Sequence, residues 1–118
     1  MGIEVRVCLI DLKPAFRRLI ARLPDESEAG ADFIVFKADA DHLEIVSGGT
    51  SETLGATVVH PGEARVPCSV FRGVSRTLRF YWGRTVSVAS SKGLLVIGRT
   101  EFRHPNICVS FNAGDKAG

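Results

Sequence analysis

Two short stretches of this chain carry rows of positively charged side chains at helical spacing. Arg72, Arg76 and Arg79 lie at i, i+4 and i+7, so a helix would gather them on one face. The earlier stretch has a similar row: Lys13, Arg17, Arg18 and Arg22. Cationic groups on a rigid helix suit contact with the phosphates of a polyanion, without reading its sequence. An ordinary solvated helix face has the same pattern, so both interpretations stay open.

The distribution of charge is more informative than its total. The net charge is only +2, but residues 13–23 and 69–79 together hold seven of the 15 Lys and Arg residues and none of the 13 Asp and Glu residues. Basic charge concentrated in this way favours a polyanionic partner.

The apolar residues of the same stretches predict the helices that position these charges. A first helix over residues 12–23 would begin after Asp11 as N-cap, hold Pro14 in its first turn and end at Pro24. Its apolar stripe comprises Leu12, Phe16, Leu19, Ile20 and Leu23. A second helix within residues 67–80 would expose its three arginines and bury a matching stripe: Val70, Phe71, Val74 and Leu78.

Alternating apolar and polar residues between and around the helices predict strands. The expected strands are residues 3–9, 33–36, 43–46, 53–60, 64–66, 85–89, 94–97 and 107–111. Turns or loops are expected between them, at residues 24–32, 39–41, 48–51, 91–93 and 99–105. Residues 112–118 read as a mobile polar tail.

The order of these elements repeats, and some residues repeat with it. Phe16-Arg17 matches Phe71-Arg72, and Leu43 with Ile45 matches Leu95 with Ile97. We therefore predict one α+β domain over residues 1–118, made of two β-α-β-β-β units at about 3–60 and 64–111. A pseudo-two-fold axis would relate the units, with antiparallel sheets and both helices on one face. Phe16 and Phe71 should then occupy equivalent buried positions.

The sequence offers little for catalysis. Glu101 and His104 could form an acid–base pair, but no nucleophile or substrate pocket is evident beside them, and a surface loop or a partner contact explains them as well. Ser51 and Ser69 lack the strand-turn-helix setting of a hydrolase serine. We expect a protein that is not an enzyme.

Metal and cofactor sites are not expected either. Asp39, Asp41 and His42 are typical of a hairpin turn and provide too few ligands for a closed metal site. The glycines at residues 48–49 are followed by neither a helix nor the lysine of a phosphate-binding loop.

The three cysteines, Cys8, Cys68 and Cys108, are far apart and form no C-x-x-C motif. With no signal peptide visible, they indicate free, buried thiols in a reducing compartment, and so a cytoplasmic protein. No apolar run approaches the roughly 20 residues needed to span a bilayer, so no membrane association is expected.

Three segments resemble a domain of the DNA polymerase processivity clamps, the ring-shaped sliding clamps. Residues 36–48 (FKADADHLEIVSG) and 86–98 (VSVASSKGLLVIG) are similar to the two clamp hairpins. Residues 62–71 (GEARVPCSVF) are similar to the short clamp strand that leads through proline into a helix. The resemblance covers nearly the whole chain as a pattern of elements.

This resemblance implies that the helices line a ring and face duplex DNA without sequence specificity. The residues it places toward DNA are Lys13, Arg17, Arg18, Arg22, Arg72, Arg76 and Arg79. Clamp chains hold two or three such domains and close a ring of six, whereas this sequence holds one. The resemblance therefore implies a homo-oligomer joined through strand edges, accessory to replication or repair. The alternative is a clamp-fold protein-interaction domain with no DNA role.

Overall fold

The computed structural model describes residues 2–22, 33–47 and 50–110, and these form nine strands and two helices. In chain order the elements are β1 (Ile3–Cys8), α1 (Leu9–Ala21), β2 (Phe33–Asp39), β3 (His42–Ser47), β4 (Thr50–His60), β5 (Gly62–Pro67), α2 (Cys68–Leu78), β6 (Thr85–Ser91), β7 (Leu94–Ile97), β8 (Thr100–Arg103) and β9 (Cys108–Ser110). The predicted α+β class is confirmed.

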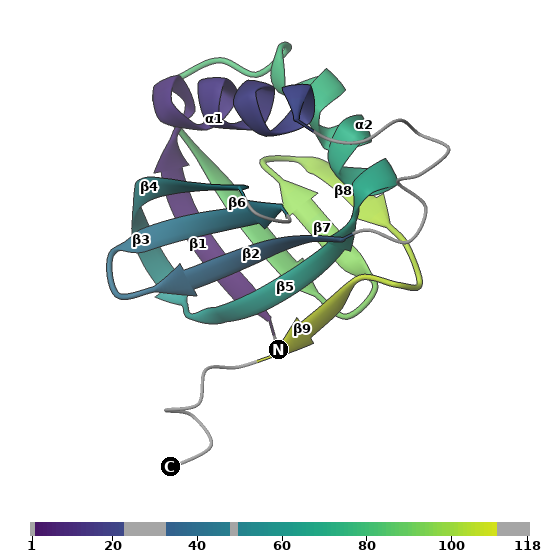
Figure 1. Ribbon diagram of the computed structural model, residues 1–118. Helices are drawn as coiled ribbons and strands as arrows, with labels where there is room; N and C mark the ends of the chain where they lie inside the picture. The colour runs from purple at the N-terminus through teal and green to yellow at the C-terminus, as the bar shows by residue number, and fades with distance from the viewer. Residues whose placement is uncertain (1, 23–32, 48–49, 111–118) are drawn as a thin grey trace.

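All nine strands belong to one antiparallel sheet, in the order β8-β7-β6-β1-β4-β3-β2-β5-β9. The sheet curves strongly, and α1 and α2 lie together across its open side (Figure 1). The prediction of both helices on one face is therefore confirmed. The strands form one continuous sheet because β1 pairs with β6 and β2 pairs with β5. Each unit thus contributes two strands that pair with strands of the other unit.

Strand pairing also supports the predicted pseudo-two-fold relation. In the first unit, β4 pairs with β3 through residues 50–55 and then with β1 through residues 56–60. In the second unit two separate strands make the corresponding pairings: β8 pairs with β7, and β9 pairs with β5. β8 and β9 together are therefore the counterpart of β4, interrupted by residues 104–107.

The strand β8 corrects the sequence analysis, which predicted a polar loop over residues 99–105. Only Phe102 of its central residues turns toward the core, while Glu101 and Arg103 are exposed. An edge strand with one inward side chain carries little apolar periodicity, so its pattern resembles that of a loop.

The first helix begins earlier than predicted. Cys8 rather than Asp11 is the N-cap, without a side-chain cap hydrogen bond, and Pro14 lies in the second turn rather than the first. Leu12, Phe16 and Leu19 are buried as predicted, whereas Ile20 is only partly buried and Leu23 lies outside the described residues. Tertiary burial of this stripe compensates for the hydrogen bond that the proline cannot donate.

The second helix buries Phe71, Val74 and Leu78 as predicted, while Val70 is only partly buried. The Phe16 and Phe71 rings stack at the helix–helix contact, with centroids 4.5 Å apart and an interplanar angle of 27°. Phe36 of β2 lies 6.2 Å from the first ring and 6.1 Å from the second. Equivalent burial of the two matched phenylalanines is confirmed.

The cysteines depart from the prediction in their exposure. Only Cys68 is buried, whereas Cys8 and Cys108 are exposed. Both exposed residues lie in strands whose alternate side chains face away from the core. The predicted tail, residues 112–118, and the acidic loop, residues 24–32, lie outside the described part of the chain.

Gly73 provides a test of how α2 is stabilised. It lies inside the helix, and a Cβ atom added there would meet only Phe102 Cε1, at an ordinary contact distance of 3.9 Å. Gly73→Ala should raise the free energy of unfolding by about 0.5–1 kcal/mol, because alanine loses less backbone entropy in a helix. Urea denaturation measures the change.

Gly98→Ala is the matched control. Gly98 has a φ of +61°, and an added Cβ would lie 2.6 Å from Cε2 of Tyr81. This variant should lose stability by about 1 kcal/mol or more, from left-handed strain and the clash. A destabilised Gly73→Ala variant would contradict the packing described between α2 and β8.

Candidate functional site

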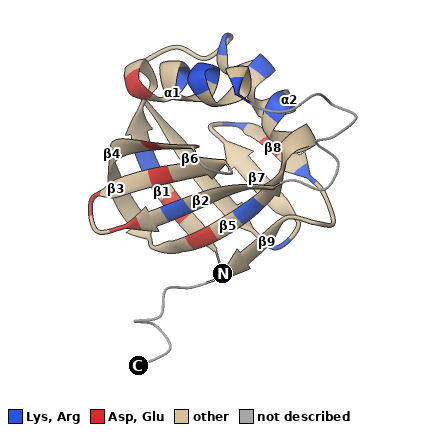
Figure 2. Cartoon of the chain, viewed as in Figure 1, with Lys and Arg blue, Asp and Glu red and all other residues tan. Residues whose placement is uncertain are grey.

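The helix layer is the most basic surface of the fold. In Figure 2, Lys and Arg positions are frequent along α1 and α2, whereas the strands carry residues of both signs. Asp11 is the one acidic residue in α1, and α2 has none. The sheet balances its charges more closely, as in the pair of Lys37 Nζ and Glu63 Oε1, 3.8 Å apart.

Three of the predicted residues border a shallow groove between the helices. Lys13 and Arg17 come from α1, and Arg79 comes from the C-cap of α2. The groove also has apolar lining from Phe16, Ile20 and Leu78. Packing of the apolar stripes against each other sets the distance between the helices, and so brings cations from both units to one place.

Local contacts orient two of these three cations. Lys13 Nζ donates a hydrogen bond of 2.5 Å to the backbone oxygen of Tyr81. Arg79 Nε donates to the backbone oxygen of Arg76 at 3.3 Å, and its guanidinium lies 5.5 Å from the centroid of the Phe80 ring. Both remain able to meet a further anion, because each has several donors.

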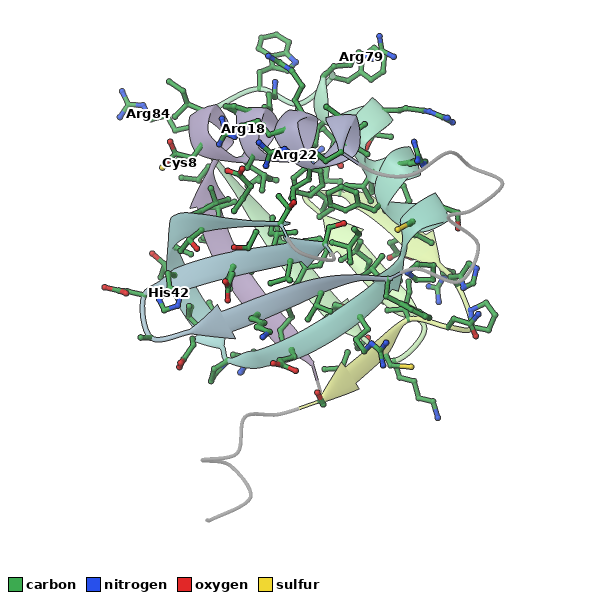
Figure 3. The ribbon with its side chains drawn as sticks, in the orientation of Figure 1. Cys8, Arg18, Arg22, His42, Arg79 and Arg84 are labelled. Carbon is green, nitrogen blue, oxygen red and sulfur yellow. The ribbon has the colours of Figure 1, made fainter. Side chains whose placement is uncertain are left out.

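Arg18 and Arg22 lie on another flank of α1, which faces β4. Figure 3 shows both side chains on the near side of α1, well away from Arg79. Arg18 donates two hydrogen bonds to Glu52 of β4, from Nε at 3.0 Å and from Nη2 at 2.6 Å. The Arg18 guanidinium is therefore already paired with a carboxylate.

This pair changes the titration of both groups. The hydrogen bond from Arg18 lowers the pKa of Glu52 below its ordinary value, burial opposes that effect, and the charges of Arg18 and Arg22 add to it. The same hydrogen bond raises the pKa of Arg18. Glu52 thus offsets part of the positive charge on this flank.

The arginines of α2 are not equivalent in exposure. Arg76 and Arg79 are exposed, but Arg72 is half-buried. The expectation that all three would be exposed is therefore wrong for Arg72. The helical period gathers the three on one side of α2, but it does not show how far the neighbouring elements cover that side.

Sequence reasoning missed Glu52 because residues 48–51 were predicted to be a turn. β4 begins at Thr50, so Glu52 lies in the strand and shares a face with Leu54, which is buried against the helices. Extending the predicted strand 53–60 backward by one position would have placed the Glu52 carboxylate on the same face as Leu54, beneath α1.

The alternative chemical sites are explained by local contacts. Glu101 pairs with Arg103 at 2.9 Å, while His104 Nδ1 accepts a hydrogen bond from the backbone N–H of Asn106 at 3.1 Å. Nδ1 of His42 lies 3.7 Å from the exposed Asp41 in the β2–β3 turn. Within residues 2–22, 33–47 and 50–110, no three His, Cys, Asp or Glu side chains gather as a metal site would require.

None of the described helices has both the length and the apolar character needed to cross a membrane.

No protein-family model matches the sequence, and a search of curated proteins finds no match.

Solved structures of DNA polymerase clamps do match the fold. A DNA polymerase III beta subunit from Eubacterium rectale matches 99% of this chain and 32% of its own, with a TM-score of 0.69 and 14% identity. The C. crescentus beta sliding clamp matches 97% of this chain and 31% of its own, with a TM-score of 0.63 and 17% identity. The Bacillus subtilis sliding clamp matches 100% of this chain and 33% of its own, with a TM-score of 0.64 and 13% identity.

These matches show that the chain has the fold of a single clamp domain, as its sequence pattern suggested. The chain spans about a third of the length of each solved clamp. At such identities the likeness concerns the fold alone.

The Arg18–Glu52 pair gives a pH dependence that can be tested. Because the pKa of Glu52 is lowered by folding, the pair stabilises the protein above the unfolded pKa, about 4.3, and this contribution is lost as pH falls through the lower folded pKa. As pH is lowered below about 5, the free energy of unfolding of Glu52→Gln should therefore fall less steeply than that of the unaltered protein. Urea denaturation at a series of pH values measures this slope.

Arg18→Gln serves as the partner variant and should flatten the profile in the same way, since it removes the group that lowers the pKa of Glu52. A Glu52→Gln profile parallel to that of the unaltered protein would show that the pair does not persist in solution.

Proposed function

We propose that this chain is a non-enzymatic, clamp-type module whose helix layer holds the backbone of duplex DNA without reading base sequence. The observation that carries the proposal is the groove where Lys13 and Arg17 of α1 meet Arg79 of α2. Cations from both units converge there on the helix layer, which is the layer that faces DNA in the clamps that this fold resembles. Lys and Arg on rigid helices suit phosphate contact, since each neutralised phosphate releases counterions.

Of the seven residues predicted from the sequence, we assign the strongest phosphate contacts to the exposed Arg17, Arg76 and Arg79, and the half-buried Lys13 supports them at the groove. Arg22 is exposed and supplements them from the β4 flank. Arg18 can exchange Glu52 for a phosphate, because an exposed ion pair contributes little stability. Arg72, being half-buried, contributes charge at longer range.

We further propose that copies of this domain associate through strand edges. Among the described strands, β8 and β9 are the two ends of the sheet, so each has one edge without a neighbour. Open edges readily pair with another chain. Association would bring several helix layers to one duplex, and weak contacts would then act together.

A second candidate function, protein interaction without DNA, has its own supporting observation. Ile10 is 81% exposed. It borders a recess between α1 and β4, beside Pro14 and Thr53. An apolar side chain at the edge of a recess suits docking of a partner protein, which would then explain the clamp fold without nucleic acid.

The DNA proposal is tested by the salt dependence of binding. The triple variant Arg17→Gln, Arg76→Gln and Arg79→Gln removes three exposed cations of the helix layer. The slope of log affinity against log salt should become shallower by up to about three, at about 0.9 per lost contact, equally for unrelated duplex sequences. Fluorescence anisotropy of a labelled duplex, measured over a salt series, gives the slope.

The matched control removes the same charge from strand positions. Arg6, Arg65 and Arg103 are exposed on strands whose alternate side chains point into the core. Their triple Gln variant should retain most of the slope. Equal slopes in both triple variants, or no salt-sensitive binding by the folded protein at low ionic strength, would refute the DNA proposal and favour the interaction module.

Self-association is tested separately by light scattering. We expect a mass of several times 12.7 kDa at micromolar concentration. Proline within β8, as in Glu101→Pro, should shift the population toward monomer, because proline cannot donate a strand hydrogen bond. Circular dichroism must show that the variant is folded. A monomer at every concentration would contradict association through these edges.

A further inference from the structure

The segment between α2 and β6 exposes two large aromatic side chains on the helix layer. In this segment, residues 79–84, Trp82 is 91% exposed and Phe80 is 72% exposed. We call it the aromatic loop. Large apolar side chains in one short loop are seldom left in water without a function.

The exposure follows from how the loop is anchored. Tyr81, between the two exposed rings, points inward, where its hydroxyl contacts the backbone oxygen of Ile97 and Oγ1 of Thr100. The residues on either side of it, Phe80 and Trp82, are the two that remain exposed.

Backbone hydrogen bonds hold the loop at both ends. The N–H of Phe80 donates to Thr77 at 3.0 Å, the N–H of Tyr81 donates to Leu78 at 3.1 Å, and the backbone oxygen of Arg84 accepts from Leu9 at 2.9 Å. Lys13 adds its hydrogen bond to the Tyr81 oxygen. The rings are thus presented by an ordered backbone, which reduces the entropy lost on binding a ligand.

The charge around the rings is positive. The aromatic loop begins with Arg79 and ends with Arg84, and it contains no acidic residue. Figure 3 shows Arg79 at the outer surface of the helix layer and Arg84 beyond the start of α1. Asp11, in the first turn of α1, is the acidic residue of that helix and reduces the charge at the Arg84 end.

We propose that the aromatic loop binds single-stranded nucleic acid, with unpaired bases stacked on Trp82 and Phe80 and phosphates held by Arg79, Arg84 and Lys13. Alternating aromatic and basic side chains are what such a ligand requires, since bases stack on rings while cations follow the backbone. A duplex hides its bases within its own stack, so the rings would gain little from it. This ligand goes beyond the duplex contact proposed above.

Trp82 is the only tryptophan of the chain, so its fluorescence reports directly on the site. The first experiment titrates the intact protein with a single-stranded thymidine oligonucleotide, a duplex of the same length and a base-free phosphodiester chain. Stacking of bases should quench the emission in the first titration and leave it nearly unchanged in the other two.

The second experiment measures affinity by anisotropy of a labelled single strand. Trp82→Ala and Phe80→Ala should each weaken binding by about fivefold or more, as expected for loss of a stacking platform. Duplex affinity should change less than twofold. Val59→Ala is the matched control: Val59 is 48% exposed, in the part of β4 that pairs with the start of β1, at the other end from α1. It should bind both ligands as the unaltered protein does.

These readouts separate this inference from the duplex proposal. Quenching by the single strand that persists in Val59→Ala supports the proposed site on the aromatic loop. It does so even if the protein binds no duplex, that is, even if the duplex proposal fails. Unquenched emission at saturating single strand, equal quenching by the base-free chain, or a spectral response only to an acidic peptide or anionic vesicles would overturn it. Equal weakening in Val59→Ala would also overturn it.

Discussion

The stack of Phe16 on Phe71 is the contact on which the rest of the fold depends. It joins the two units at the helix–helix contact, and Phe36 of β2 packs against both rings. Removing either ring from such a position leaves a cavity and lowers the free energy of unfolding by about 3–5 kcal/mol. Because the stack fixes which side of each helix faces inward, it also fixes which positions are left for charge.

The two units use this shared frame differently on their flanks. In the first unit, Arg18 of α1 reaches Glu52 of β4 as an ion pair. At the corresponding place in the second unit, Gly73 of α2 lies close to Phe102 of β8. The charge of the first helix is therefore partly offset on one flank, while the groove between the helices keeps its cations from both units. The two units share one arrangement of strands and helix, but residue differences at their flanks make the basic surface asymmetric.

The sequence predicted what depends on local periodicity and failed where long-range pairing decides. Both helices and their buried phenylalanines followed from the 3.6-residue period, and the hairpins followed from alternation around Leu43 and Leu95. The exchange of strands that joins the sheet, by contrast, leaves no local pattern. β8 was missed because an edge strand needs little apolar alternation. At the site, the helical period did not separate Arg18 and Arg22 from the cations that border the groove, and only the fold places Glu52 beside Arg18 and partly covers Arg72.

In the aromatic loop, one partly buried side chain anchors two exposed ones. Tyr81 is held by polar contacts at Ile97 and Thr100, next to Gly98, whose positive φ and missing Cβ leave room for the tyrosine ring. Phe80 and Trp82, on either side of Tyr81, are left exposed to solvent. Lys13 then bonds the loop to α1, so the same side chain serves both the groove and the loop. Lys13 therefore connects the basic groove to the loop that presents the exposed rings.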